Sequence, residues 1–550
     1  MKRLLSDPRT LFIATYIILL LPNAGLSLTE PMTASERAAN VLLPAGVYLL
    51  LLSCFRQPAK GFWWVFLLVF LSAFQMVLLY LFGDSIIAVD MFLNLVTTNP
   101  SEVEELLGSL LPAIIGVVVI YVPVIALAIV RTGRHSYILT DTFMRKTRVA
   151  GAAVAAIGAV MVGVCRVAPT SQRATPYSVL DKLYPVNVGY NVYLAVERTR
   201  LTAAREQNVA EFRFEATHVP DSLREVYVMV IGETARAENF GILGYNRPTT
   251  PRMSAADGVV AFREAYTQSN TTHKSVPMLL SAASAVDFDR LYAQKGVLAA
   301  FGEAGFHTAF ISNQRPNHSF IDFLGGEADV CRFLKEESDE DANVPDCALV
   351  DVLARLIKET QGNLFVVLHT YGSHFRYNER YPESMRRWTP DGPDDAVASN
   401  REALINAYDN TILYTDRLLG DIIDTLAATG VSAAMLYASD HGENIFDDGK
   451  GLFLHASPRP SAHELHVPMI AWTSQRHREL RPDVSEALEA NSSRRVLTSA
   501  SLFHTMLHLG GVETAIFADS LSAASPRMAD IPYLYLTDRN VPVPVEEIMR

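Results

Sequence analysis

The stretch V-M-V-I-G-E-T-A-R, residues 228–236, decides the fold of the larger part of this chain. Its first residues form the unbroken apolar run that is typical of a strand buried on both faces of a parallel sheet. Glu233 then places a carboxylate directly after the run. Because ligands of open α/β sheets bind outside the carboxyl ends of the strands, this carboxylate indicates a functional site at the edge of the sheet.

Similar apolar runs alternate with stretches of helical pattern through the rest of the chain. The clearest helical stretch covers residues 403–427. The apolar runs lie at 226–231, 307–311, 364–368, 433–438 and 467–472. This alternation predicts an α/β domain with a mostly parallel sheet.

Polar side chains follow three of the other runs. Asn313 comes after the second run, His369 and His374 after the third, and Asp440 and His441 after the fourth. Each has an ordinary explanation alone, since a lone histidine is usually a surface or core residue. Their recurrence at successive strand ends favours a functional site. Glu, Asp and His are the residue types that bind zinc, so we predict a zinc site here.

Residues 268–280, Q-S-N-T-T-H-K-S-V-P-M-L-L, contain a candidate nucleophile. Pro277 suits the first turn of a helix, and Ser275 suits its cap. Thr271 and Thr272 are then expected in the loop ahead of the helix, where backbone N–H groups attract anions. A threonine becomes a covalent nucleophile once a metal or base lowers its pKa. Two adjacent threonines are also common as ordinary loop residues.

The first third of the chain is much more apolar than the rest. Uncharged runs cover residues 10–29, 38–55, 61–82, 106–130 and 149–165. Each approaches the ~20 residues with which a helix crosses a bilayer. A cleaved signal peptide would account for the first run only. We therefore predict a transmembrane domain of five helices.

The domain organisation follows from these patterns. We predict the five-helix transmembrane domain at residues 1–168, an amphipathic connector at 169–223, and a catalytic α/β domain at 224–550. The connector contains Y-P-V-N-V-G-Y-N-V-Y-L, which fits a helix lying on the membrane surface or a linker helix packed on the α/β domain.

Charge predicts the orientation in the membrane. Basic residues before the first run and in alternate loops are Lys2, Arg3, Arg9, Arg56, Lys60, Arg131, Arg134, Arg145, Lys146 and Arg148. Positive loops stay in the cytoplasm, so an odd number of spans places the α/β domain in the periplasm of a bacterial inner membrane. The net charge of −12 and the lack of a basic stripe argue against a nucleic-acid partner.

The four cysteines fall into two pairs. Cys54 and Cys165 lie within or beside apolar runs, whereas Cys331 and Cys347 flank the acidic stretch E-E-S-D-E-D in the exported part. An oxidising compartment favours a disulfide between Cys331 and Cys347 over two free thiols.

Several separate motifs carry a resemblance to a known family. They are G-E-T-A-R-A-E-N-F, G-Y-N-R-P-T-T-P, T-x-x-S-V-P, H-x-x-x-x-H, N-A-Y-D-N, S-D-H-G-E and L-H. Over essentially its whole length the chain resembles the phosphoethanolamine transferases of Gram-negative inner membranes, a group that includes lipid A-modifying, colistin-resistance enzymes. Five spans, a connector and an alkaline-phosphatase/sulfatase-like domain are the architecture of that family.

The resemblance implies roles for individual residues. The nucleophile of the family stands five residues before the proline of S-V-P, which is Thr272 here. The zinc ligands correspond to Glu233, Thr272, Asp440 and His441. His374 and His455 match positions that bind the phosphoryl group or a second zinc, so the resemblance implies one or two Zn²⁺ ions.

The resemblance also implies a lipid-binding face near the membrane. Asn94, Thr98 and Glu102 recur every four residues and would share one face of a helix. This face would help to hold the phospholipid head group. Pro100 interrupts a regular helix and favours a solvated loop instead.

The implied reaction takes phosphoethanolamine from phosphatidylethanolamine, passes it through a threonine intermediate, and releases diacylglycerol. Gln268 and Met278 stand where lipid A enzymes carry cysteines, and Arg315 and Asn317 stand where a lysine is expected. These differences leave lipid A, the lipopolysaccharide (LPS) core, another glycan or a protein open as the acceptor.

Three other functions fit parts of the sequence. A phosphoglycerol transferase would use the same core with phosphatidylglycerol, and a membrane-tethered phosphodiesterase would pass the intermediate to water. A non-catalytic scaffold would bind lipid or envelope partners, although it would have no reason to keep the complete Glu, Thr, Asp and His set. The sequence contains no C/S-x-P-x-R motif, which argues against the modified nucleophile of sulfatases.

Overall fold

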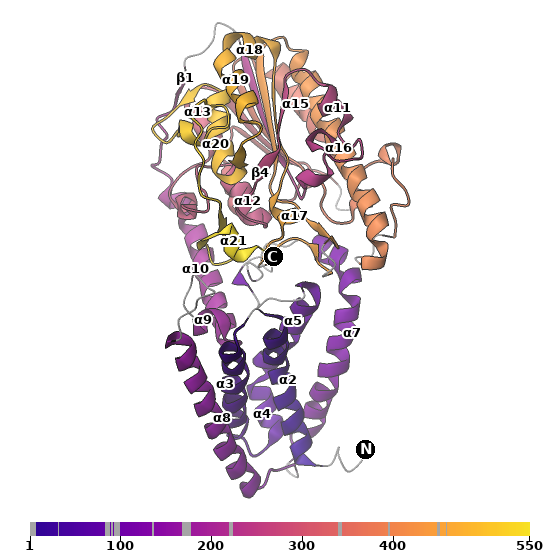
Figure 1. Ribbon diagram of the computed structural model, residues 1–550, viewed down its shortest axis with the longest axis vertical. Helices are drawn as coiled ribbons and strands as arrows, with labels where there is room; N and C mark the ends of the chain where they lie inside the picture. Colours follow the sequence, from indigo (N-terminus) through magenta and orange to yellow (C-terminus); the bar gives the residue numbers. More distant parts are fainter. Residues whose placement is uncertain are drawn as a thin grey trace. The chain divides into compact units, whose positions relative to one another are not determined.

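The computed structural model describes residues 7–30, 32–82, 88–89, 92, 100–134, 137–167, 178–218, 224–338, 344–393, 397–447, 451–457 and 459–549. The chain folds into two compact units. We call them the helical unit, mainly Met1–Asn94 and Leu106–Val196, and the sheet unit, mainly Glu197–Asp447 and Phe453–Arg550. Figure 1 shows the helices of the first and the layered sheet of the second.

The five apolar runs all lie in helices of the helical unit. These helices are α2 (Pro8–Thr29), α3 (Ala34–Leu52), α4 (Pro58–Trp64) with α5 (Phe66–Phe82), α7 (Pro100–Arg131) and α8 (Asp141–Val167). Among the described residues, α2, α8 and the 112–131 part of α7 are long and apolar enough to cross a membrane. The pair α4–α5 is bent by 65° and could form one further span.

The prediction of five spans is therefore corrected to three or four by length and composition. Helix α3 falls short because Glu36, Arg37 and Asn40 lie in its first two turns. Glu36 is used at the helix start, where it closes a capping box with Thr33. Asn40 is buried, and its amide donates to the Asn23 carbonyl on α2 at 3.1 Å.

Helices α3 and α8 pack with their backbones in close contact. A Cβ atom at Gly46 would lie 2.2 Å from the Ala155 nitrogen, and one at Gly158 would lie 2.4 Å from the Leu43 nitrogen. Small residues allow this approach, which is how membrane helices gain packing energy without a hydrophobic driving force.

Helix α10 (Val186–Asn208) occupies most of the described part of the predicted connector. In its last turns the Arg205 guanidinium donates to the Leu291 carbonyl and to Glu327, both at 2.8 Å. The second half of α10 thus packs on the sheet unit, as a linker helix would. Residues 169–177 and 219–223 of the connector lie outside the described residues.

The sheet unit is built on a seven-stranded sheet with the order β3-β11-β8-β2-β7-β5-β6. The strands are β2 (Glu225–Gly232), β3 (Val259–Phe262), β5 (His307–Ser312), β6 (Val330–Phe333), β7 (Leu364–His369), β8 (Ser432–Ser439) and β11 (Met469–Thr473). The five apolar runs correspond to β2, β5, β7, β8 and β11. Strand β11 runs antiparallel to both of its neighbours, and the other pairs are parallel, so the sheet is mixed but mostly parallel.

Helices cover both faces of this sheet, which explains why β2 is buried along its whole length. Figure 1 shows α13 (Val297–Glu303) and α20 (Thr498–Leu509) on one side and α15 (Ala348–Glu359) and α16 (Arg401–Ala427) on the other. Tyr227, Met229 and Ile231 share a hydrophobic core with α13 and α20. The carboxyl ends of β2, β5, β7 and β8 therefore meet at one edge, which we call the site edge.

The predicted disulfide is wrong, because Cys331 and Cys347 are both free thiols in the structure. Cys331 is exposed on the edge strand β6, whereas Cys347 precedes α15 and its backbone N–H donates to the Tyr414 hydroxyl at 3.4 Å. The two cysteines thus lie on different elements, and each has its own neighbours.

Candidate functional site

The site edge places Glu233 beside Asp440. Strands β2 and β8 are adjacent and in parallel register, with Gly232 opposite Ser439, so the next residue of each strand enters the same space. Thr234 fixes both carboxylates: its N–H donates to Asp440 Oδ1 at 3.0 Å and its hydroxyl donates to Glu233 Oε1 at 2.7 Å. Thr234 has a φ of 60°, a costly conformation that tends to occur at functional sites.

Thr272 reaches this pair of carboxylates from α12 (Thr272–Leu279). Its Oγ1 lies 3.1 Å from His441 Nε2 and 3.4 Å from Glu233 Oε1. The expected helix start is corrected, since Thr271 is the N-cap and Thr272 is already the first helical residue, with Pro277 inside the helix. This difference matters, because the helical backbone fixes the direction of the Thr272 side chain, which a flexible loop would not do.

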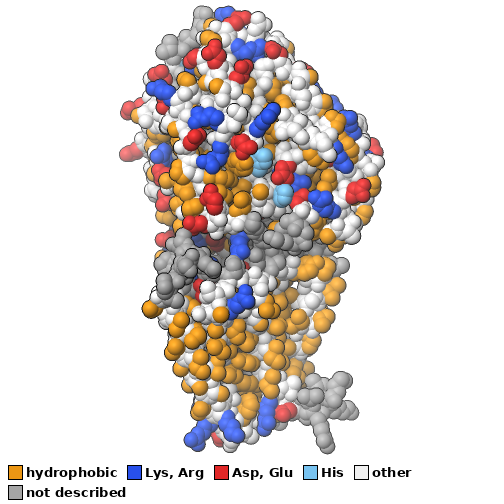
Figure 2. Space-filling view, in the orientation of Figure 1, with side chains coloured by type: hydrophobic (Ala, Val, Ile, Leu, Met, Phe, Trp, Pro, Cys, Tyr) orange, Lys and Arg blue, Asp and Glu red, His pale blue; other side chains and the backbone are white. Residues whose placement is uncertain are grey.

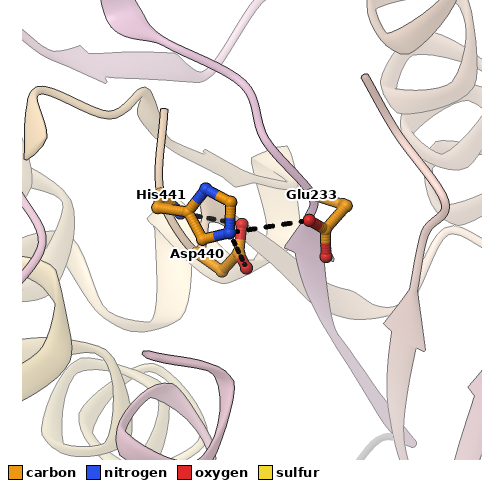
Figure 3. Close-up of side chains that lie close together, drawn as sticks. All are labelled: Glu233, Asp440 and His441. Carbon is orange, nitrogen blue, oxygen red and sulfur yellow. Dashed lines mark hydrogen bonds and ion pairs between the residues drawn. The ribbon is translucent and has the colours of Figure 1, made fainter. Parts of the chain in front are cut away.

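Glu233, Asp440 and His441 form a compact, fully buried set of potential metal ligands (Figure 3). One ligand atom from each lies within 4.8 Å of the others. Asp440 Oδ2 is 3.2 Å from His441 Nε2 and has no hydrogen-bond partner, although it is buried. A buried carboxylate oxygen without a partner is costly, and a cation among these three groups would remove that cost.

The pKa shifts of Glu233, Asp440 and His441 also favour a cation at this position. Burial and the nearby charge of Glu233 raise the pKa of Asp440 to about 7. Burial also acts to raise the pKa of Glu233, but the charges of His441 and His374 outweigh it and lower that pKa. Burial acts to lower the pKa of His441, yet the two carboxylates raise it. Among the described residues, no lysine or arginine pairs with Glu233 or Asp440.

The His441 ring is oriented for metal binding. Its Nδ1 lies 3.0 Å from the Gly442 carbonyl oxygen, which can only accept a hydrogen bond. Nδ1 must therefore carry the proton, and the lone pair of Nε2 faces Thr272 and the two carboxylates. Such a carbonyl contact commonly fixes the tautomer of a zinc-bound histidine. The donor set fits zinc, which binds carboxylate oxygen and imidazole nitrogen.

His455 lies next to His441 and is oriented by a contact with Glu443. The two rings are 4.0 Å apart between centroids. His455 Nδ1 is 3.1 Å from Glu443 Oε1, and the other Glu443 oxygen accepts a hydrogen bond from the Tyr377 hydroxyl. Burial raises the pKa of Glu443 to about 8. This chain of contacts leaves His455 Nε2 directed away from Glu443.

The predicted residues His374 and Asn313 occupy different parts of the site edge. His374 stacks on Tyr371 with 5.0 Å between ring centroids and lies close enough to affect the pKa of both Glu233 and His455. Asn313 is buried, and its amide donates to Asp346 at 2.7 Å. The same Asp346 carboxylate accepts from the N–H groups of Tyr371 and Gly372, so Asn313 supports the loop that carries His374.

The predicted membrane-side residues fall outside the part of the chain that the structure describes in full. Asn94 and Thr98 lie outside the described residues, and Glu102 belongs to α7, but its side chain is not among the described ones. Their role in binding a lipid head group stays a prediction.

Sequence reasoning missed three residues that support the site. Gln314 donates from its amide to Glu233 Oε2 at 3.1 Å and to the Thr370 carbonyl at 2.9 Å, which turns Oε1 of the glutamate toward Thr272. Glu443 stands inside the motif S-D-H-G-E, and Gln314 directly follows the predicted residue Asn313, so their positions were a usable signal. Tyr377 follows no motif, and only the fold brings it to Glu443.

Comparison with known proteins identifies the family of the chain. Residues 225–512, more than half of the chain, match the family model described as Sulfatase. The phosphoethanolamine transferase EptA of Escherichia coli strain K12 is 30% identical over 326 residues, which are 56% of this chain and 57% of that protein. The chain thus matches little more than half the length of this curated relative.

Two solved structures share the fold. The integral membrane protein lipooligosaccharide phosphoethanolamine transferase A from Neisseria meningitidis aligns with a TM-score of 0.73 and 20% identity over 95% of this chain and 98% of that one. The periplasmic domain of EptC from Escherichia coli, solved as a complex with Zn, aligns with a TM-score of 0.55 and 21% identity over 60% of this chain and 96% of that one. At these identities the likeness shows the fold. The match over residues 225–512 establishes that the chain belongs to the sulfatase family.

Proposed function

We propose that this protein transfers phosphoethanolamine from phosphatidylethanolamine to an envelope acceptor, namely lipid A, the LPS core or another glycan. The observation that carries the proposal is the position of Thr272, whose Oγ1 lies 3.1 Å from His441 Nε2 and 3.4 Å from Glu233 Oε1. A hydroxyl placed inside a buried set of metal ligands is suited to act as a nucleophile. The named phosphoethanolamine transferase among the relatives supports the same reaction.

Zinc is the metal that this proposal requires. Glu233, Asp440 and His441 would hold it, with Thr272 as a further ligand. The unpartnered Asp440 Oδ2 and the zinc complex of the EptC domain both support this choice. When bound, zinc would lower the pKa of the Thr272 hydroxyl and offset negative charge on a transferred phosphoryl group.

The first half-reaction is a displacement at phosphorus. Thr272 Oγ forms a bond to the phosphorus of phosphatidylethanolamine, and the bond from phosphorus to the glycerol oxygen breaks. The threonine proton ends on that oxygen, so diacylglycerol leaves as a neutral alcohol. Phosphoethanolamine then remains on Thr272. In the second half-reaction an acceptor oxygen attacks the same phosphorus, the bond to Thr272 breaks, and the threonine recovers its proton.

His374 and His455 would hold the phosphoryl oxygens. Glu443 and Tyr377 orient His455: the neutral Glu443 carboxyl, whose pKa burial raises to about 8, donates to His455 Nδ1, so Nε2 carries the ring proton toward the substrate. His374 approaches the same space from the loop after β7. Fixed donors of this kind contribute to catalysis because they need no reorganisation when charge develops.

The proposed setting is the bacterial inner membrane. We propose five spans, with α3 added to the apolar helices because it packs closely along α8, and with the basic loops in the cytoplasm this odd number would leave the sheet unit in the periplasm. A lipid donor and a lipid-linked acceptor are both available in that compartment.

A covalent adduct tests the proposal. The full chain is incubated with a phosphatidylethanolamine whose ethanolamine carries a heavy isotope, and the digested protein is mapped by mass spectrometry. We expect the added mass on Thr272, none in Thr272→Ala, and an undiminished amount in Thr271→Ala. Thr271 is the matched control because its hydroxyl lies 3.2 Å from the Ser269 hydroxyl instead of in the metal-ligand set.

Other outcomes would identify the rival functions. An adduct from phosphatidylglycerol in place of phosphatidylethanolamine would show a phosphoglycerol transferase. Free phosphoethanolamine without a modified acceptor would show a phosphodiesterase. Absence of any adduct, together with unchanged membrane glycolipids in cells that lack the gene, would favour a scaffold and overturn the proposal.

A further inference from the structure

A groove of about 610 Å³ lies on the helical unit between α3 and α8. Its apolar walls are formed by Val47, Leu50, Leu51, Val149 and Ala152. Several of these side chains are open to the surroundings, with exposed fractions of 44% for Val47 and 65% for Val149. In a helical unit of this hydropathy, such a surface faces hydrocarbon rather than water.

One end of the groove is polar and carries a fixed arginine. Arg148, on α8, donates from Nε and Nη2 to the Ser53 carbonyl at 3.3 and 3.0 Å. Ser53 is the C-cap of α3, where the free carbonyls of the helix end attract a cation. The rest of the Arg148 side chain is exposed. Its guanidinium is thus held at the rim of an apolar groove with donors turned outward.

The surroundings of Arg148 are positively charged. Arg145 and Lys146 are exposed on the same turns of α8. The carboxylate of Asp141, at the start of α8, pairs with Arg56 at 3.1 Å. Figure 2 shows the Lys and Arg side chains gathered at the lower end of the helical unit, directly beside its apolar surface.

Aromatic side chains mark the same level of the bundle as a membrane interface. The Trp64 ring is 78% exposed and stacks on Phe55 with 5.9 Å between centroids. Exposed tryptophans of this kind lie at the head-group level of bilayers. The groove therefore runs from the interface into the hydrocarbon, with Arg148 at its polar end.

We propose that this groove binds a phospholipid with an anionic head group, from the leaflet next to the basic loops. One acyl chain would lie along the apolar walls, and the head group would meet Arg148, with Arg145 and Lys146 nearby. Basic pockets between membrane helices on the cytoplasmic side have the chemistry that recognises anionic head groups. The site is distinct from the candidate metal centre and makes no use of the transfer reaction.

Native mass spectrometry of the full chain in detergent tests the proposal. The protein is titrated with phosphatidylglycerol or phosphatidylethanolamine that have identical acyl chains, so the two lipids differ only in the head group. We expect one phosphatidylglycerol to bind several-fold more tightly than phosphatidylethanolamine. Loss of one arginine at the head group should weaken the binding of phosphatidylglycerol about fivefold.

Three variants assign the site. Arg148→Ala should lose the preference for phosphatidylglycerol, and Ala152→Phe should weaken binding of the same lipid by filling the groove without changing charge. Arg134→Ala is the matched control, because it removes an exposed arginine from the loop before α8 and does not line the groove. A thermal melt of each variant verifies that the bundle is folded.

The binding data of these variants distinguish a specific lipid site from general positive charge. Weaker phosphatidylglycerol binding in Arg148→Ala and Ala152→Phe, with Arg134→Ala unchanged, supports the groove. Equal binding of the two lipids by the native protein would overturn the proposal. An equal loss in Arg134→Ala and Arg148→Ala would also overturn it, because the preference would then come from general positive charge.

Discussion

Two regions of the sheet unit gather carboxylates, and they neutralise them differently. Around α11 (Pro251–Ala255), the chain supplies its own cation: Arg252 forms ion pairs with Asp421 and Asp424, and the backbone N–H groups of Arg252 and Met253 donate to Asp416 at 2.9 Å. At the site edge, Glu233 and Asp440 meet histidine and hydroxyl groups but, among the described residues, no lysine or arginine.

The difference separates structural carboxylates from functional ones. A folded chain does not keep two buried carboxylates together without compensation, since removing a charge from water costs several kcal/mol. At α11 the compensation comes from within the chain, although burial still raises the pKa of Asp416 to about 6. At the site edge the compensation is weaker, because burial and Glu233 raise the pKa of Asp440 to about 7 and its Oδ2, although close to His441, accepts no hydrogen bond. An external cation is the compensation that the site edge lacks.

The largest expected effect comes from exchanging one carboxylate in each region. Asp440→Asn should release the metal and lower transfer activity by more than about 100-fold, since even residues behind the ligands change affinity or activity by 10–100-fold. Asp416→Asn should leave metal content and activity near the native level. Elemental analysis and a transfer assay measure both. A metal-loaded, active Asp440→Asn protein would remove the distinction between the two regions.

The same two substitutions should differ in their effect on stability when a chelator is present. Asp416→Asn places an amide against two N–H groups and should lower the free energy of unfolding by about 1–3 kcal/mol. Asp440→Asn keeps an acceptor for the Thr234 and His441 N–H groups and replaces the oxygen that has no hydrogen bond, so it should leave that free energy unchanged or raise it. Urea unfolding of the chelated proteins measures the difference. Equal destabilisation by both variants would show that Asp440 is compensated within the chain.

A third carboxylate offers a test by pH. Burial acts to raise the pKa of Asp447, but Arg236 and the Ile445 N–H outweigh it and hold that pKa at about 2. The two oxygens of Asp447 contact Arg236 at 2.7 Å and Arg401 at 2.9 Å. Because the pKa is depressed in the folded protein, the stabilisation is present above the unfolded value, about 3.9, and is lost as pH falls toward 2.

We therefore expect Asp447→Asn to be less stable than the native protein by about 2 kcal/mol near neutral pH. The difference should shrink between pH 4 and pH 2, roughly the interval between the two pKa values. Urea midpoints across this range measure it. A difference that stays constant down to pH 2 would mean that the charge of Asp447 contributes nothing.

The sequence predicted the parts of the site that depend on strand ends. Glu233, Asp440 and His441 each lie within three residues of the end of an apolar run, and the parallel pairing of β2 with β7 and β8 brings the ends of these strands together. Thr272 required a resemblance to a family, because nothing in residues 268–280 alone distinguishes it from Thr271. The helix start was missed because Pro277 was assigned to the first turn, although the helix begins five residues earlier.

Contacts between site residues that are far apart in the sequence could not be predicted. Tyr377 reaches Glu443 across 66 residues, and Gln314 reaches Glu233 across 81. Such contacts depend on how loops fold over the sheet, which hydrophobic periodicity does not encode. The disulfide prediction was wrong for the same reason. It rested on Cys331 and Cys347 being the two cysteines of the exported region, and this count does not show whether the fold brings them together.

The smallest expected effect concerns the cation at α11. The Arg252 side chain is 34% exposed, so solvent and salt screen its pairs with Asp421 and Asp424. Exposed ion pairs contribute about 0.2–1 kcal/mol each, and Arg252→Ala should lower the free energy of unfolding by about 1 kcal/mol at low salt. The loss should be smaller in 1 M salt, whereas transfer activity and metal content should not change.

Arg252→Lys separates charge from packing in this last test. The arginine lies so close to Gly420 that a Cβ there would be 2.3 Å from its Nε, so its stem and fork cover the helix surface of α16. Lysine keeps a positive charge and an aliphatic stem but cannot bond to two carboxylates with one planar fork. If Arg252→Lys is as stable as the native protein and Arg252→Ala is not, charge and stem suffice. If both variants lose the same stability regardless of salt, the planar guanidinium is required at α11. The hydrogen-bond geometry of Arg252 would then contribute more than its charge.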